Sequence, residues 1–317
     1  MPEIPKLNLI YVASIGRSGS TLLESMLGSH SQMTTIGEVH LWPYEILDGG
    51  VLRCGSGKYV QDDPFWIEMR RRVAPLLQPS PRLHFFREKH NMGRSIRPER
   101  LREFGRDPLS PEVAAQVEIY GQNNYALFKT FLDLIEETSG RRPAWVVDAS
   151  KDLYRLLWLA RSGLFNLKVL HVVRNPRGFA YSITKRWINS DEPRSDLLRF
   201  LQTVRHSLAW TVQNHLISTL LSNHLPSSHA MRVHYEALAA RPHQTFQQIC
   251  SVIGCEYESE AVDDFRRGNA YTIGGNPMRY DQRGIALDEN WRTQLPRSSR
   301  LIVDLVTSAN RTHFGYQ

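Results

Sequence analysis

The stretch LNLIYVASIGRSGSTLLESML, residues 7–27, decides the fold of this chain. An apolar run over residues 7–15 stops at a glycine turn, and apolar residues at helical spacing begin again with Leu22. This pattern predicts a buried strand, a tight turn and a helix. The N-terminus of such a helix carries unpaired backbone N–H groups and the positive end of the helix dipole, so it favours an anion.

The composition of the turn points to a phosphate or sulfate cradle. A helix cap alone would need one hydroxyl group, whereas this turn combines two glycines, one arginine and three hydroxyl residues. These residues are Gly16, Arg17, Ser18, Gly19, Ser20 and Thr21. A nucleotide-hydrolase P-loop places a lysine after its second glycine and then a residue for magnesium, but here Ser20 follows Gly19. We therefore expect no metal at this site.

Length, charge and cysteines set broad limits. A chain of 317 residues favours one large α/β domain over two independent ones. The net charge of +7 favours acidic partners, among which nucleotides, sulfated molecules, nucleic acid and anionic membranes fit equally. Cys54, Cys250 and Cys255 are too few and too poorly arranged for a disulfide framework or a zinc site. With no evident secretion signal or membrane-length apolar run, we expect a cytoplasmic protein.

Further strand-and-helix units follow along the chain. Apolar runs near residues 144–148, 167–173 and 231–235 each lead into a helical pattern, which predicts a mostly parallel sheet flanked by helices. Ser110-Pro111 starts a helix that Gly140 ends, a second helix spans residues 195–225, and a closing helix spans 300–309. A glycine-rich basic loop at 274–284 precedes the closing helix.

Two polar positions at strand ends are candidate site residues. Arg174 ends a strand, and Asn175-Pro176 then starts a helix that carries Ser182, which suggests a second anion site. Taken alone, Arg174 would be an ordinary ion-pair partner. Glu38 follows a short strand, and it can either face the crevice at the carboxyl ends of the strands or pair with a neighbouring arginine on the surface. The scattered histidines His30, His40 and His171 are expected to be structural.

Residues 41–107 form the least regular part of the sequence. Prolines and glycines interrupt them, and a basic tract runs over residues 82–106. Glutamates alternate with the arginines of this tract, as on a solvated helix face. We interpret the segment as an inserted acceptor-side lobe of a single domain rather than as a nucleic-acid surface.

Two anion sites on one parallel sheet, the first without magnesium-binding residues, resemble the sulfotransferases that use 3′-phosphoadenosine 5′-phosphosulfate (PAPS). The soluble bacterial type is most similar, and the tyrosylprotein and carbohydrate sulfotransferases share the outline. The resemblance rests on GRSGSTLL at 16–23, GE at 37–38, DASK at 148–151 and VVRNPRGFAYS at 172–182. VHYEALAARP at 233–242 and GNPMRYDQRG at 275–284 give weaker support.

The resemblance implies a P-loop-like sulfotransferase fold and a role for each matching residue. The turn from Gly16 to Thr21 would bind the 5′-phosphosulfate, Arg174 and Ser182 the 3′-phosphate, and Tyr235 would lie near the adenine. Arg283 and Gly284 would close over the 3′-phosphate. Glu38 would be the catalytic base, Arg17 would neutralise the leaving phosphate, and Lys151 would assist.

The implied reaction moves a sulfuryl group from PAPS to a hydroxyl or amine of a small-molecule, lipid or carbohydrate acceptor, without metal. Two alternatives stay open at this point. One is a small-molecule or nucleotide kinase of the P-loop type. The other is a basic protein that binds nucleic acid or glycan through residues 82–106.

Overall fold

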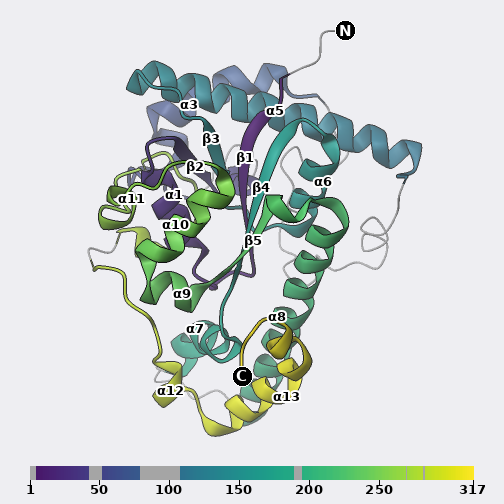
Figure 1. The fold of residues 1–317 in the computed structure, drawn as a ribbon, viewed down its shortest axis with the longest axis vertical. Coiled ribbons are helices and arrows are strands. Elements are labelled where there is room, and N and C mark those ends of the chain that lie inside the picture. The colour runs from purple at the N-terminus through teal and green to yellow at the C-terminus, as the bar shows by residue number, and fades with distance from the viewer. Residues whose placement is uncertain (1–4, 43–51, 79–107, 189–194, 269, 281–282) are drawn as a thin grey trace.

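The computed structural model describes residues 5–42, 52–78, 108–188, 195–268, 270–280 and 283–317. Its centre is a five-stranded sheet in the order β2-β3-β1-β4-β5, and every pair of neighbouring strands is parallel (Figure 1). The strands are β1 (Leu7–Ser14), β2 (Met33–Gly37), β3 (Trp145–Asp148), β4 (Phe165–Val173) and β5 (Ala230–His234). The predicted parallel α/β sheet is confirmed.

The central strand β1 is apolar along its length because helices cover both faces of the sheet. Its Leu9 and Tyr11 belong to the apolar cluster that contains the helices α5 (Pro111–Ser139), α6 (Leu153–Ser162) and α8 (Asp196–His224). Its Ile10 and Val12 belong to the cluster on the opposite face, with α1 (Ser20–Ser29), α9 (Tyr235–Ala240) and α10 (Pro242–Ile253). The alternation of side chains along a strand thus builds two cores, and Figure 1 shows the two helix layers on either side of the sheet.

The remaining helices are α3 (Pro64–Val73), α7 (Pro176–Ile188), α11 (Glu260–Asp263), α12 (Trp291–Gln294) and α13 (Arg297–His313). They lie around this centre, with α3 in the upper part of Figure 1 and α7, α12 and α13 in the lower part. Short 3-10 turns lie at Val39–Leu41, Val60–Asp62, Ala74–Leu76, Ser227–His229 and Pro277–Tyr280. Within the described residues, every helix is too short or too polar to cross a lipid bilayer.

The predicted helix boundaries agree with cap chemistry. The Ser110 hydroxyl accepts a hydrogen bond from the Val113 amide at 3.4 Å, and Gly140 ends α5 in the left-handed conformation with φ of 71°. The closing helix is longer than predicted, since α13 begins at Arg297 and ends at His313. Some of its leucines are exposed and polar residues lie between them, so the apolar pattern marks only part of this helix.

The predicted inserted lobe, residues 41–107, lies only partly within the described residues. The basic tract at 82–106 is outside them, so the interpretation of that tract remains a prediction. The described part contains α3, which packs against α5 through an edge-to-face contact between Phe65 and Phe131 with ring centroids 5.7 Å apart. Trp42 and Trp66 lie in the same cluster, with 5.6 Å between their rings. This portion of the lobe is therefore continuous with the main core.

Candidate active site

The turn between β1 and α1 is shaped by two residues in the left-handed region. Arg17 has φ of 74° and Gly19 has φ of 91°. A Cβ atom at Gly19 would lie 2.3 Å from the Tyr235 ring, so only glycine fits beneath this tyrosine. Ser20 and Thr21 follow as the first buried residues of α1. The predicted cradle is thus a strand-to-helix turn in which the N-terminus of α1 faces the carboxyl edge of the sheet.

The two predicted anion sites are in direct contact. The Arg17 side chain donates from Nη2 to the Ser182 carbonyl at 3.2 Å. The Arg174 side chain donates from Nη1 to the backbone carbonyl of Arg17 at 3.3 Å. Residues 157 positions apart in the chain therefore form one site, because β1 and β4 are adjacent and both end at the same edge.

Arg174 is buried and held from several sides. Its guanidinium carbon lies 4.3 Å from the centre of the Tyr235 ring, and its carbonyl accepts a hydrogen bond from the Trp210 indole at 2.9 Å. A Cβ at Gly178 would be 3.1 Å from the Arg174 Nε, so this glycine leaves room for the side chain in the first turn of α7. Ser182, one turn further along, is buried and donates to the Phe179 carbonyl at 2.7 Å.

Two buried donors of this site fit an anionic ligand. Arg174 Nε and Ser18 Oγ have no hydrogen-bond partner among the described residues, and both are shielded from solvent. Leaving a buried polar group unpaired is unfavourable by about 1–3 kcal/mol, and more for a charged group. Phosphate and sulfate oxygens would satisfy these donors, so the residues present fit the PAPS site that the resemblance implies.

Glu38 and Lys151 form an ion pair at the ends of β2 and β3. Lys151 Nζ lies 2.6 Å from Glu38 Oε1, and their side chains are only 13% and 15% exposed. Lys151 adopts φ of 61°, which is unusual for a residue with a side chain. The Glu38 amide is fixed by the Ile273 carbonyl at 2.7 Å. Glu38 is thus partly buried and paired with a lysine rather than with an arginine on the surface, and its place in a crevice at the strand ends stays a prediction.

A buried ion pair that no sequence pattern indicated fixes the segment just before Lys151. Arg155 Nε lies 2.7 Å from Asp148 Oδ2, and both side chains are fully buried. Arg155 also donates to the Tyr120 hydroxyl at 2.8 Å and to Asn124 Oδ1 at 2.7 Å. Asp148 Oδ1 accepts the Ser150 amide at 2.8 Å, which fixes the turn just before Lys151.

A second ion pair that no sequence pattern indicated joins α1, the helix after the cradle turn, to the glycine-rich loop at 274–284. Glu24 on α1 is buried, its Oε1 accepts from Thr35 Oγ1 at 3.0 Å, and its Oε2 lies 3.6 Å from Arg279 Nη2. Burial raises the pKa of the Glu24 carboxyl, and the Arg279 charge opposes this shift. The Asn276 amide donates to Thr21 Oγ1 at 3.3 Å, so the 274–280 part of the loop is seated on the cradle.

Arg283 and Gly284 are exposed, and the Arg283 carbonyl accepts a hydrogen bond from Arg266 at 2.8 Å. Their predicted closure over the 3′-phosphate remains a prediction. From the same segment it is Asp288 that meets Arg174, with 3.1 Å between Asp288 Oδ2 and Arg174 Nη2. No sequence pattern pointed to Asp288.

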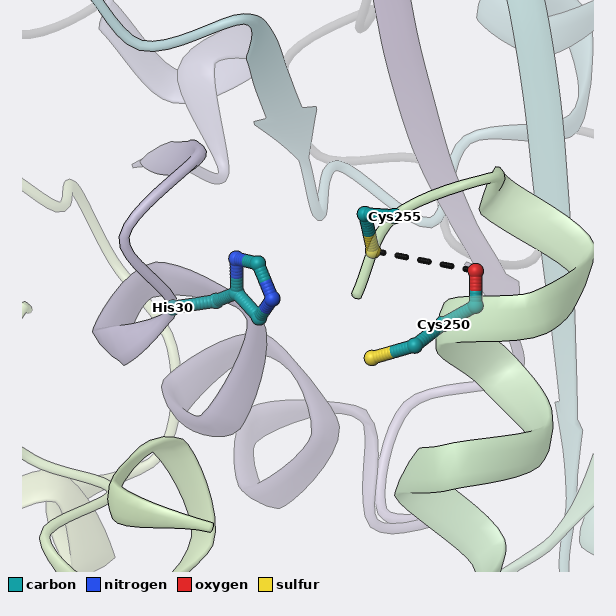
Figure 2. A group of neighbouring side chains, drawn as sticks. All are labelled: His30, Cys250 and Cys255. Carbon is teal, nitrogen blue, oxygen red and sulfur yellow. Dashed lines mark hydrogen bonds between the residues drawn. The ribbon is translucent and has the colours of Figure 1, made fainter. Parts of the chain in front are cut away.

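Two of the three cysteines, whose spacing predicts no zinc site, meet a histidine. His30, Cys250 and Cys255 face one another in Figure 2, and their potential ligand atoms lie within 4.8 Å of one another. The His30 Nδ1 accepts the Gln32 amide at 3.1 Å, so its ring proton lies on Nε2, 2.8 Å from the Glu256 carbonyl. Both ring nitrogens are therefore engaged in holding the end of α1, the structural role expected for His30.

Comparisons with known proteins agree with this fold. Residues 158–270 match the model of the sulfotransferase domain family. The sulfotransferase domain from the Synechococcus PCC 7002 olefin synthase is 20% identical, with a TM-score of 0.56 over 100% of this chain and 98% of that one. The sulfotransferase domain from the curacin biosynthetic pathway is also 20% identical, with a TM-score of 0.54 over 99% of each chain. No curated protein sequence matches the chain.

Proposed function

We propose that this chain transfers the sulfuryl group of PAPS, because residues 158–270 match the sulfotransferase domain family and the fold is similar to that of two sulfotransferase domains. The acceptor is a hydroxyl or amine of a small molecule, lipid or carbohydrate. In this reaction the S–O bond to the phosphate of PAPS breaks, a bond from sulfur to the acceptor atom forms, and the acceptor loses a proton.

The observation that carries the proposal is the contact between Arg17 and Arg174. The Arg174 guanidinium bonds the Arg17 carbonyl and the Arg17 guanidinium bonds the Ser182 carbonyl, and two buried donors nearby have no partner among the described residues. Such an arrangement suits a ligand with two separate anionic groups. The turn from Gly16 to Thr21 would hold the 5′-phosphosulfate, and Arg174 with Ser182 the 3′-phosphate. Tyr235, whose ring lies against both Gly19 and the Arg174 guanidinium, would lie near the adenine.

The chain's own residues then supply positioning, charge and a base. Glu38 would take the acceptor proton as a carboxylate, since it lies at the strand ends beside the cradle. Arg17 would balance the negative charge that develops on the leaving phosphate. Lys151, 2.6 Å from Glu38, holds this carboxylate in place and adds positive charge on the same side of the site.

The Glu38→Gln variant tests the base. A positioned general base contributes ~10²–10⁴-fold to a rate, and glutamine keeps the shape of the side chain. We expect turnover with labelled PAPS to fall by that factor, while affinity for 3′,5′-ADP, measured by calorimetry, stays within about twofold. Glu136→Gln is the matched control, because Glu136 is half exposed on α5, away from the strand ends. Turnover of Glu38→Gln equal to that of the control would remove Glu38 from this role.

The same calorimetry separates the alternatives. If the chain is a sulfotransferase, 3′,5′-ADP should bind in the presence of a chelator that removes divalent metals. If it is a kinase, ATP should bind in a magnesium-dependent manner. A protein that binds nucleic acid or glycan through residues 82–106 would show steeply salt-dependent binding to the polymer that survives Arg17→Ala and Arg174→Ala. Absence of any binding of PAPS or 3′,5′-ADP would refute the proposed function.

A further inference from the structure

A carboxylate of the chain itself pairs with the guanidinium of Arg174. Arg174 Nη2 lies 3.1 Å from Asp288 Oδ2 and 3.3 Å from the Asp288 carbonyl. The Arg174 side chain is 7% exposed and that of Asp288 is 26% exposed. The pair is therefore largely shielded from water, and its interaction is stronger than that of a surface ion pair.

The segment around Asp288 is built to present this carboxylate. The Asp288 amide donates to the Tyr235 hydroxyl at 3.2 Å, while the Tyr235 ring lies against the Arg174 guanidinium. On the other side, Asn290 donates to Asp288 Oδ1 from its amide at 3.3 Å and from its side chain at 3.0 Å. One carboxylate oxygen is thus fixed by Asn290, and the other is directed at Arg174.

The charges around Asp288 agree with this geometry. Partial burial raises the pKa of the Asp288 carboxyl, but the charge and hydrogen bond of Arg174 and the hydrogen bond from the Asn290 amide lower it, and the net result is a pKa below its usual range. Lys185 on α7 also acts on Asp288 electrostatically in the same direction. A carboxylate displaced from Arg174 would therefore keep a cationic neighbour.

We propose that Asp288 is an internal competitor for the phosphate group that Arg174 binds. It neutralises Arg174 in the free enzyme, is displaced when the phosphate enters, and returns when the nucleotide product leaves. This inference rests on the proposed function, in which Arg174 takes the 3′-phosphate of the nucleotide. The effect is to weaken the binding of 3′,5′-ADP and to speed its release, because the 3′-phosphate competes with the Asp288 carboxylate for the Arg174 guanidinium.

The test is calorimetry of 3′,5′-ADP with the wild type and with Asp288→Asn. Asparagine keeps the size of the side chain and the oxygen that Asn290 contacts, but it removes the charge. A hydrogen bond to a charged group contributes about 1.5–3 kcal/mol, so we expect Asp288→Asn to bind 3′,5′-ADP about ten- to a hundredfold more tightly. Stopped-flow dissociation should slow by a similar factor. Affinity for 5′-AMP, which has no 3′-phosphate, should stay within about twofold.

Two variants make the result specific. Asp196→Asn is the matched control, since its side chain is 96% exposed at the start of α8, and its affinities should equal those of the wild type. In an Arg174→Ala background, Asp288→Asn should give no gain. Asp288→Ser, which also removes the charge, should reproduce the tighter binding if Asp288→Asn lowers the melting temperature.

The outcomes are distinguishable. Equal or weaker 3′,5′-ADP binding by both Asp288 variants would overturn the inference and leave the proposed function intact. An equal gain for 5′-AMP would also overturn it, because the effect would not involve the 3′-phosphate. Absence of 3′,5′-ADP binding to wild type and variants alike would overturn the proposed function and this inference together.

Discussion

At the scale of single residues, the tightest constraint on the site is the absence of a side chain at Gly19. Its φ of 91° is rarely adopted by other residues, and a Cβ there would lie 2.3 Å from the Tyr235 ring. Gly19→Ala must therefore strain the turn and push Tyr235 away from Arg174. We expect a loss of about 1–3 kcal/mol in the free energy of unfolding, measured in urea, and a loss of 3′,5′-ADP affinity of at least about tenfold.

Gly16→Ala is the control for stability, because a Cβ at Gly16 meets no atom within 4 Å and its φ is not positive. Its free energy of unfolding should lie within about 0.5 kcal/mol of the wild type. If Gly19→Ala were as stable as Gly16→Ala and bound 3′,5′-ADP normally, the packing of Tyr235 on the cradle would not matter for the site.

At the scale of elements, the turn after β3 depends on the buried pair of Asp148 and Arg155. Removing one partner of a buried ion pair leaves an uncompensated charge and costs about 3–5 kcal/mol. We expect Asp148→Ala to lower the free energy of unfolding by that amount, as measured in urea. The exposed pair of Asp196 and Arg199, where Asp196 is 96% exposed, gives the comparison. Arg199→Ala should cost less than about 1 kcal/mol, and similar losses in the two variants would contradict the assigned role of Asp148.

The same elements show which features the sequence could predict. The strand, turn and helix of residues 7–27 are a local pattern, so the order of residue types along the chain is enough to locate the cradle. Arg174 and Ser182 follow from a second copy of that pattern at the end of β4. Their contact with Arg17 needed only the rule that parallel strands end at one edge of the sheet. These site features are encoded within short windows of sequence.

The features that were missed depend on contacts between side chains, several of them between segments far apart in the chain. Asp288 and Arg174 are 114 positions apart, and Arg279 meets Glu24 from the far end of the chain. Cys250 and Cys255 come together because α10 ends at Gly254, whose amide and that of Cys255 both bond to the Cys250 carbonyl. Neither periodicity nor spacing reports such contacts, since they depend on how loops cross the ends of the helices.

At the scale of the whole molecule, His171 makes stability depend on pH. It lies on β4, its Nε2 is 3.0 Å from Asn214 Oδ1 on α8, and its ring packs edge-on against Phe314 near the C-terminus. Burial lowers the pKa of His171 to about 4. The unfolded chain binds this proton near pH 6.5. Between these two values the unfolded state binds more protons, so stability is full above about pH 6.5 and falls as the pH drops toward 4.

We expect His171 to contribute a loss of about 2 kcal/mol in the free energy of unfolding between pH 7 and pH 5. Urea unfolding of the wild type and of His171→Gln at both pH values isolates this contribution. Glutamine does not titrate and can still hydrogen-bond Asn214, so the variant should lose less stability than the wild type over this range. Parallel losses in the two proteins would mean that His171 accepts a proton in the folded state without breaking the packing between β4, α8 and the C-terminal segment.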